Sequence, residues 1–462
     1  MNIIIFIVST WTSIANTVDV CATCKVKTVK DAIEIASEND TILIKKGTYK
    51  EYNINVNKPL TIIGENYPVI DGELKGEIIR ITADNVTLDG LFIINVGTSY
   101  TEDFSAVRVV KSKNFVIKNL VLEKLFFGIY IEKSSYGKIF HNKIIGDAKE
   151  EFNSGNGIQL WYSHHIKVDK NIITHVRDGI YLEFADHCSI TNNTSTDNVR
   201  YGLHFMFSND DIYEKNSFQN NGAGVAVMFS KRIEMYNNIF QGNWGTASYG
   251  LLLKEINDSK IKGNLFKENT TGINIEGSNR VTYSFNTFEK NGWAIKSRGA
   301  CYTNIFSDNN FLYNTFDLSY NSKLNDNKFE NNHWSDYSGY DLDKDGIGDV
   351  PHKPVNLFTE NNFLYNSFDL SYNSKLNDNR FSDNYWSNYT GYDLNKDGIG
   401  DVPYRPVKLF SYVVNRTPEA IILLRSLFID IIDFSEKVSP VFTPNNLEDI
   451  SPKMKRIVYD RN

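Results

Sequence analysis

A repeat of about 22 residues between residues 128 and 310 constrains this chain more than any other feature. Each unit carries a glycine, then Ile, Leu or Val, then any residue, then an apolar residue. These boxes begin at Gly128, Gly157, Gly179, Gly202, Gly224, Gly250 and Gly272. An asparagine that opens another apolar alternation follows most of them, as at Asn216 and Asn238. A fixed period in the twenties is the signature of a solenoid, in which each unit packs on its neighbours.

The apolar residues inside each unit alternate with a period of two, which indicates strands rather than helices. Asn and Gly between the strands favour turns, because both tolerate left-handed backbone angles. A unit of this size with two or three short strands is one coil of a parallel β-helix, whose coils stack about 4.8 Å apart. We therefore expect the recurring asparagines to form an internal ladder of side-chain hydrogen bonds.

A solenoid needs caps, because its end coils have no neighbour on one side. Thr28, followed three residues later by Asp31, predicts the start of a short amphipathic helix. Strand-like segments at 41–44 and 54–64 flank a Gly-Thr-Tyr turn at 47–49. This order resembles the entry to pectate-lyase-like right-handed β-helices. The expected fold is therefore all-β, a right-handed parallel β-helix with an N-terminal capping helix.

Charge and targeting signals narrow the class of protein. The net charge is −7 and no basic run occurs, so nucleic-acid binding is excluded. An apolar stretch at 3–8 and the small residues Ser13 and Ala15 predict a secretory signal peptide over 1–17, and hence export. No uncharged apolar run reaches about 20 residues, so no transmembrane helix is expected.

The four cysteines carry little information. Cys21 and Cys24 form a CxxC pair just after the expected cleavage site. Two interpretations stay open for the pair, a soft-metal or redox site and a local disulfide in an oxidising compartment. Cys188 and Cys301 are expected to be small core residues.

One face of the solenoid has the side chains of a copper site. Residues one and three places after each box glycine should face inward, and those two and four places after it outward. His204 and Met206 then point outward in one coil, and Met228 lies at the register of Met206 in the next. Thioether plus imidazole suits Cu(I), so we predict a copper site at these three residues. Two alternatives remain: an apolar patch for a protein partner, and a register one residue different that would bury both Met side chains.

Several longer segments resemble the NosD family. They lie at 200–210, 223–235, 249–256, 384–389, 391–407 and 416–421. The resemblance implies an exported, non-catalytic subunit that works with an ABC transporter to assemble the copper–sulfide centre of nitrous oxide reductase. The implied partners are a NosF-like ATPase with its NosY-like permease, a NosL-like copper chaperone and the apo-reductase. The membrane would be reached only through the permease.

Two other function classes compete with this interpretation. A polysaccharide lyase or epimerase on the same scaffold needs acidic groups and a base stacked on one face. The outward column reads Trp161, Glu183, Met206, Met228 and Lys254. The acid and the base are separated by the two Met coils, which fits such an enzyme poorly. A carbohydrate-binding or purely scaffolding β-helix is the remaining alternative.

Residues 309–358 recur almost unchanged at 361–410, a duplication that departs from the family pattern, which carries this segment once. Each copy ends in a loop rich in Asp. The side chains are Asp341, Asp343, Asp345 and Asp349 in the first loop, and Asp393, Asn395, Asp397 and Asp401 in the second. They match the first half of an EF-hand calcium loop, although the closing Glu is missing. We predict structural calcium; the alternative is a pair of Asx-rich turns.

Beyond residue 411 the β pattern stops. Thr417 and Pro418 predict the start of a helix that runs to about Ser435. The helix is apolar around most of its surface. Its expected docking residues are Ile421, Leu424, Leu427, Phe428 and Ile431. It either caps the solenoid or docks into the membrane partner, which the resemblance favours. The expected organisation is therefore a signal peptide over 1–17, a right-handed β-helix over 18–308, a duplicated β-helix extension with the two acidic loops over 309–411, and a docking helix and tail over 412–462.

Overall fold

The computed structural model describes ten stretches of the chain. They are residues 16–99, 101–152, 154–244, 248–320, 326–352, 357–359, 362–364, 380–406, 431 and 448–457. The chain divides into two compact units, Met1–Tyr337 and Ser338–Asn462. The expected signal peptide lies almost entirely outside the described residues.

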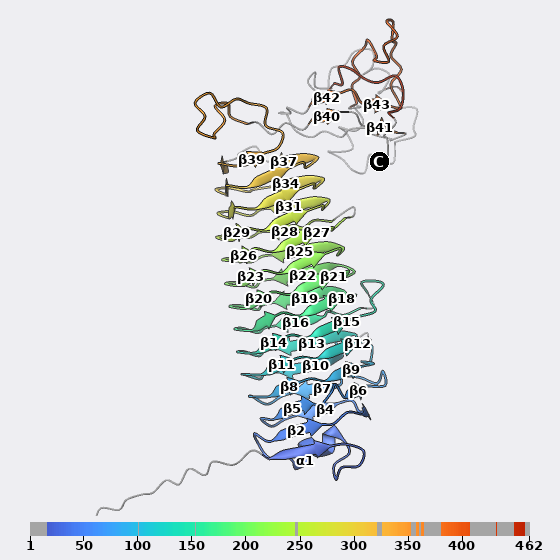
Figure 1. Ribbon diagram of the computed structural model, residues 1–462, viewed down its shortest axis with the longest axis vertical. Helices are drawn as coiled ribbons and strands as arrows, with labels where there is room; N and C mark the ends of the chain where they lie inside the picture. The colour runs from blue at the N-terminus through green and yellow to red at the C-terminus, as the bar shows by residue number, and fades with distance from the viewer. Residues whose placement is uncertain are drawn as a thin grey trace, which may run out of the picture. The chain divides into compact units, whose positions relative to one another are not determined.

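The first unit is a stack of coils built from three parallel sheets, here called A, B and C (Figure 1). Sheet A consists of β1 (Thr17–Val20), β2 (Thr41–Ile44), β5 (Thr61–Gly64), β8 (Thr87–Asp89), β11 (Val116–Lys118), β14 (Lys138–Phe140), β17 (Lys167–Asp169), β20 (Ser189–Thr191), β23 (Ile212–Glu214), β26 (Glu234–Tyr236), β29 (Lys260–Lys262), β32 (Thr282–Ser284), β35 (Ile305–Ser307) and β38 (Lys328–Glu330). Sheet B consists of β3 (Thr48–Lys50), β6 (Val69–Asp71), β9 (Phe92–Ile94), β12 (Val121–Glu123), β15 (Lys143–Ile145), β18 (Ile172–Thr174), β21 (Thr194–Thr196), β24 (Ser217–Gln219), β27 (Ile239–Gln241), β30 (Leu265–Lys267), β33 (Thr287–Glu289), β36 (Asn310–Leu312) and β39 (His333–Trp334). Sheet C consists of β4 (Ile54–Val56), β7 (Ile79–Ile81), β10 (Ser105–Val110), β13 (Phe127–Glu132), β16 (Ile158–Trp161), β19 (Asp178–Glu183), β22 (Tyr201–Met206), β25 (Ala223–Met228), β28 (Leu251–Lys254), β31 (Thr271–Glu276), β34 (Trp293–Arg298) and β37 (Phe316–Tyr320).

This architecture confirms the predicted parallel β-helix. Neighbouring coils pair in register without exception along sheet C, from Ile54↔Ile79 to Trp293↔Phe316. The right hand is the sense that parallel crossover connections adopt in nearly all proteins. Within the described residues no helix is long and apolar enough to cross a membrane.

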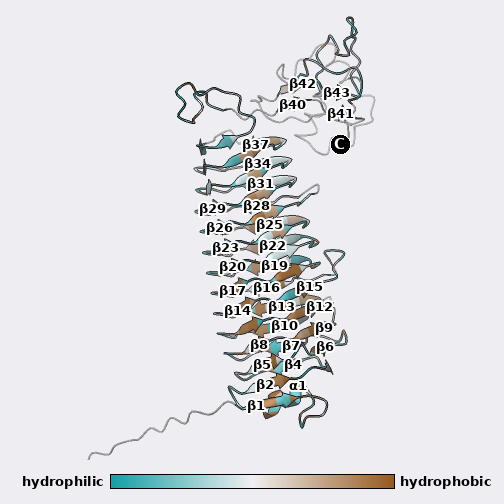
Figure 2. Ribbon diagram, viewed as in Figure 1, coloured by the Kyte–Doolittle hydropathy of each residue, from teal (hydrophilic) through white to brown (hydrophobic). Residues whose placement is uncertain are grey.

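The core is a column of apolar side chains enclosed by the three sheets. The strands supply the apolar residues of this core, and apolar stretches recur from coil to coil along the stack (Figure 2). The central residues of the sheet B strands form a continuous ring stack. It runs through Phe218, Phe240, Phe266, Phe288 and Phe311, with neighbouring centroids 4.6–5.6 Å apart. Offset aromatic stacking adds to the area that each ring buries.

The predicted asparagine ladder is present between sheets A and B. Each rung donates through its backbone N–H and Nδ2 to the Oδ1 of the asparagine one coil further along. The ladder runs through Asn142, Asn171, Asn193, Asn216, Asn238, Asn264, Asn286 and Asn309, with N···O distances of 2.9–3.0 Å. A second ladder after sheet B runs through Asn198, Asn221, Asn243, Asn269, Asn291 and Asn314. The ladders pair buried turn N–H groups that would otherwise have no partner.

The box glycines are needed for close packing, which differs from the turn role expected for glycine. None of the seven has a positive φ. A Cβ added at Gly179 would lie 1.9 Å from Ser195 Oγ and 2.5 Å from Gly202 O. The left-handed turn positions are occupied by Asn, His, Lys, Asp and aromatic residues, and by other glycines such as Gly242 and Gly263.

The N-terminal end is capped as predicted. Helix α1 (Val29–Ile35) packs against β1, β2 and β4. Thr28 is its N-cap, and the Thr28 Oγ1 accepts a hydrogen bond of 3.1 Å from the Asp31 N–H. The Glu51 carboxylate accepts from the N–H groups of Val29 and Lys30, the first free donors of the helix. A carboxylate there also complements the positive end of the helix dipole.

The duplicated segment divides between the units. The β-helix continues to β38 and β39, within the β-helix extension expected over 309–411, and the two compact units divide at Tyr337/Ser338. In the second unit β40 (Leu357–Thr359) pairs with β42 (Arg380–Ser382), and β41 (Asn362–Phe363) pairs with β43 (Tyr385–Trp386). Buried Asp449 Oδ2 accepts from Asn384 N, Asn384 Nδ2 and Trp386 Nε1. The segment 448–457 thereby takes the place of the next ladder rung.

Candidate metal-binding face

The two methionines of the predicted copper site lie side by side on the outer face of sheet C, the face turned away from the core. Met206 ends β22 and Met228 ends β25, and the two are direct Cα partners. Their column continues through Glu183 and Trp161 on one side and Lys254 on the other. The backbones of the two methionines are therefore one strand spacing apart, about 4.8 Å, and their side chains leave the sheet on the same side.

The burial of individual side chains shows which side of β22 and β25 faces the core. Leu203, Phe205, Val225 and Val227 are fully buried in the core. Met206 and Met228 are half-buried on the opposite side. The predicted register is therefore confirmed, and the alternative register that would bury both Met side chains is not the one adopted.

His204 lies on the same outer face but is not exposed. Only 5% of its surface is accessible. The rings of Tyr181 and Tyr201 lie against it, each with a centroid distance of 4.9 Å. These two tyrosines and the Arg200 side chain cover the imidazole, so His204 lies on the outer face as predicted but is shielded from solvent by its neighbours.

Sequence reasoning missed a buried carboxylate beneath His204. Asp178, the first residue of β19, is fully buried. Its Oδ1 lies 3.1 Å from Arg200 Nε, and its Oδ2 lies 3.6 Å from His204 Nδ1. Arg177 Nε is further away, at 3.9 Å from Oδ2. The one sequence feature that could have pointed to this carboxylate is its position directly before the box glycine Gly179.

A local irregularity of the strand explains why Asp178 faces outward. Gly179 and Ile180 are consecutive residues, yet both face the core: Ile180 is fully buried, and a Cβ on Gly179 would meet Ser195 Oγ of β21. Strict alternation would have placed Asp178 inside. The side chain instead joins the outer face with Arg200 and His204.

The hydrogen bond between Arg200 and His204 sets the state of the imidazole. Arg200 Nη2 lies 2.9 Å from His204 Nδ1. A guanidinium only donates, so Nδ1 is the acceptor and a neutral ring carries its proton on Nε2. His204 Nε2 is buried and has no hydrogen-bond partner. The imidazole therefore becomes a ligand only after Arg200 moves or the tautomer changes.

The outer face near Asp178 has acid and base groups but is poorly arranged for acid–base catalysis. Burial and the neighbouring Glu183 raise the pKa of Tyr181 to about 12. Burial likewise raises the pKa of Tyr249 above its ordinary value. Neither phenol is a base near neutral pH, and Asp178 is covered by Arg200 and His204. A substrate atom cannot reach the carboxylate in this arrangement.

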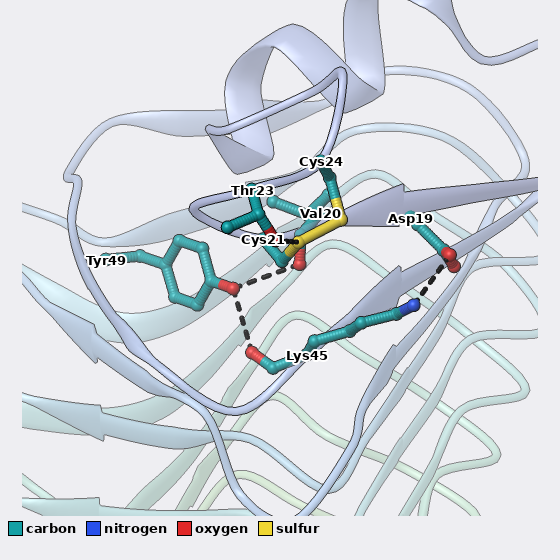
Figure 3. Close-up of a disulfide and its surroundings, with 7 residues drawn as sticks. All are labelled: Asp19, Val20, Cys21, Thr23, Cys24, Lys45 and Tyr49. Atoms are coloured by element: carbon teal, nitrogen blue, oxygen red, sulfur yellow. Dashed lines mark hydrogen bonds and ion pairs between the residues drawn. A yellow bond between two sulfur atoms is a disulfide. The ribbon is translucent and has the colours of Figure 1, made fainter.

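The CxxC pair is a disulfide. Cys21 and Cys24 are bonded next to the N-terminal cap (Figure 3). The Tyr49 hydroxyl of the Gly-Thr-Tyr turn lies beside them, 2.8 Å from Lys45 O and 3.0 Å from Val20 O. Neither sulfur is a thiolate in this state, so the pair forms no part of the metal site proposed below. Cys188 and Cys301 are buried and free, as predicted.

The acidic loops adopt the geometry of Asx-rich turns. Asp341, Asp343 and Asp345 bring carboxylate oxygens within 4.8 Å of one another. Asp341 Oδ2 accepts from Gly346 N and Asp349 Oδ2 from Leu342 N, at 3.0 and 2.8 Å. In the second loop Asp393 Oδ2 accepts from Gly398 N and Asp401 Oδ2 from Leu394 N. Asp343 and Asn395 each accept from the N–H two residues on, as do Asp345 and Asp397. Calcium there stays a prediction.

The expected C-terminal docking helix falls outside the described residues. Ile431 alone is described; it is helical and 58% exposed. The docking role of this segment stays a prediction.

Comparison with known proteins decides which family the chain resembles. Residues 140–339 match the family described as periplasmic copper-binding protein (NosD), and this span contains the paired methionines. The chain is similar to the NosD family over this span. The probable ABC transporter binding protein NosD of Pseudomonas aeruginosa is 28% identical over 377 residues, covering 70% of this chain and 79% of that protein. Its namesake from Stutzerimonas stutzeri is 25% identical over 405 residues, with 87% and 84% covered.

A solved structure supports the fold alone. The catalytic unit of an α-1,3-glucanase from Streptomyces thermodiastaticus superimposes with a TM-score of 0.50 at 13% identity, covering 67% of each chain. Fold likeness at this identity does not transfer an activity. The resemblance to NosD read from the sequence is confirmed by the family match and by both relatives.

Proposed function

We propose that this chain is a non-catalytic periplasmic subunit of an ABC-transporter system that binds copper on the outer face of sheet C. The support is the match to a family described as periplasmic and copper-binding, and two relatives named as ABC transporter binding proteins. On this proposal the copper is cargo, which the chain passes on during assembly of the copper–sulfide centre of nitrous oxide reductase.

The observation that carries the proposal is the in-register pair Met206 and Met228. Methionine normally fills cores, whereas these two half-buried thioethers lie in adjacent coils of the outer face, outside the core. Soft thioether sulfur selects Cu(I) among the common metal ions. The sheet holds the backbones of the two methionines one strand spacing apart, so both thioethers can reach the same ion.

His204 is the third proposed ligand. It lies two residues before Met206 on the same face, about 6.6 Å along the strand. Its Nε2 is a buried nitrogen without a partner, which fits a ligand position. Once Arg200 withdraws, Asp178 is placed to accept a hydrogen bond from a protonated Nδ1 of His204. A carboxylate in this position orients a metal-binding imidazole and leaves Nε2 free to bind the ion.

The test is a Cu(I) titration of the mature protein against a chromogenic chelator. We expect Met206→Leu/Met228→Leu to weaken binding by about 100-fold or more, because leucine keeps the shape and removes both sulfurs. Lys254→Gln, in the same column one coil further, is the matched control and should bind like the wild type.

Equal Cu(I) affinity in the double variant would sink the methionine site. No binding by the wild type would limit the chain to a scaffolding role among the proposed partners: the ATPase and permease, the copper chaperone and the apo-reductase.

We also propose that the two acidic loops bind calcium for stability. The convergence of Asp341, Asp343 and Asp345 supports it, since calcium takes carboxylate oxygens at flexible distances. Adding Ca²⁺ should raise the thermal midpoint of the wild type. Asp343→Asn/Asp397→Asn, which keeps the side-chain shapes, should abolish most of that rise. A midpoint that does not respond to Ca²⁺ would leave the loops as Asx-rich turns.

A further inference from the structure

Three of the eight histidines gather at one corner of the β-helix, between sheets C and A. His164 and His165 follow β16, and His187 follows β19 in the next coil. His164 is the bridge partner of Asp186, so His165 and His187 occupy the same position in consecutive coils. All three are exposed. The cluster lies across the corner from Met206, on a separate surface from the copper face.

Neighbouring rings of the cluster lie close enough to share one ion once the side chains rotate; as they stand, only Asp341, Asp343 and Asp345 among the described residues bring three donor atoms within 4.8 Å of one another. The centroids of His165 and His187 are 5.1 Å apart, and those of His164 and His165 are 5.5 Å apart. An imidazole nitrogen binds zinc at about 2.0–2.1 Å, so two rings on one tetrahedral ion have centroids about 5 Å apart. The His165 and His187 rings are now nearly parallel, at 6°. Rotation of these exposed side chains about χ2 would turn their nitrogens toward a common point.

The nitrogens of this cluster are also uncommitted. Within the described residues, no hydrogen bond or ion pair engages an imidazole nitrogen of His164, His165 or His187. The same column behaves differently further on, where Arg232 pairs with Asp210 and Arg280 with Asp258 through two contacts each. The ion-pair pattern therefore begins one coil after His187, and the histidine nitrogens face solvent without an ion-pair partner within 4.0 Å among the described residues.

We propose that His164, His165 and His187 form a second metal site, which takes a divalent ion of the kind that imidazole prefers, Cu(II) or Zn(II). The donor set differs in class from the methionine pair, since nitrogen ligands suit Cu(II) and Zn(II) whereas thioethers suit Cu(I). The site goes beyond the proposed function and does not depend on it, because it shares no ligand with the copper face.

The experiment is a titration of the untagged full chain with Cu(II) and with Zn(II) against a competing chelator. Electron paramagnetic resonance of the Cu(II) form reads out nitrogen ligation. We expect one equivalent to bind and His165→Asn/His187→Asn to weaken binding by about 100-fold or more. Asparagine suits these positions, because it occupies the same turn site in two earlier coils, at Asn85 and Asn114, with φ of 58° and 57°.

The matched control is His141→Asn/His175→Asn. Both of these histidines are exposed and adopt the same left-handed turn conformation, with φ of 56°, but lie away from the cluster. The control should keep full affinity and the nitrogen signal. Unchanged affinity in the His165/His187 variant, or no binding by the wild type, would overturn the proposal. Met206→Leu/Met228→Leu should leave Cu(II) binding intact, so failure of the two sites can be told apart.

Discussion

Replacing Arg200 with alanine is expected to lower the free energy of unfolding by about 3–5 kcal/mol, the cost of leaving a buried charge without its partner. Asp178 is fully buried, and Arg200 Nε at 3.1 Å from its Oδ1 is the nearest cation. After the substitution the carboxylate keeps only Arg177 at 3.9 Å and the imidazole of His204 at 3.6 Å. For a cooperative unit of this size, the thermal midpoint should fall by about 4–8 °C.

Arg177→Ala is the control for this substitution. The two arginine side chains are almost equally exposed, 28% for Arg177 and 29% for Arg200, but Arg177 lies further from the carboxylate. Its loss also removes the 3.2 Å hydrogen bond from Arg177 Nε to the buried Asn156 Oδ1, so it should cost about 1–3 kcal/mol, less than the loss of Arg200. Midpoints should be compared, because long repeat arrays do not always unfold in one step. Equal decreases of the thermal midpoint in the two variants would show that the Arg200–Asp178 ion pair does not contribute more to stability than the contacts of Arg177.

A double variant separates charge from shape. Asp178→Asn in the Arg200→Gln background removes the buried carboxylate together with its partner. It should be more stable than Arg200→Gln alone, because no uncompensated charge remains. A double variant that is less stable than either single one would mean that Asp178 stabilises the strand through contacts other than the ion pair.

Features that repeat along the chain could be predicted from the sequence. The period fixed which residues stack, since every coil hydrogen-bonds to the next in register. Met206 and Met228 could therefore be paired from the spacing of their glycines. The N-cap at Thr28 and the ladder through Asn238 followed from local chemistry that recurs in many folds.

Features that occur once could not be predicted in this way. Asp178 faces outward because the next two residues, Gly179 and Ile180, both face the core. A rule of strict alternation does not allow two consecutive inward residues. The burial of His204 depends on the tyrosines that cover it, and neighbours of this kind are not visible in a single strand. The histidine corner was missed because turn residues lie outside the apolar pattern. The division at Tyr337/Ser338 was missed because it falls inside the first copy of the duplicated segment, where the sequence pattern does not change.

The other large effect is expected from Asn238→Ala, in the middle of the asparagine ladder. Asn238 Oδ1 accepts from Asn216 N and Nδ2, at 2.9 and 3.0 Å, and Asn238 Nδ2 donates to Tyr213 O at 2.9 Å. Alanine removes the amide and leaves these buried groups without a partner, at about 1–3 kcal/mol for each. We expect a total loss of about 3–5 kcal/mol, since losses at one site are not fully additive.

Lys262→Ala, at an exposed position one coil further, is the control and should change stability by about 0.5 kcal/mol or less. Asn238→Asp tests which half of the amide matters. Aspartate keeps an acceptor for Asn216 but loses the donor to Tyr213 O and faces Asn264 Oδ1 with a second oxygen. If donation holds the coils together, the aspartate variant is at least as unstable as the alanine variant. A nearly wild-type midpoint for aspartate would mean that the ladder works mainly by accepting the turn N–H groups, and that its amide-to-amide bonds are secondary.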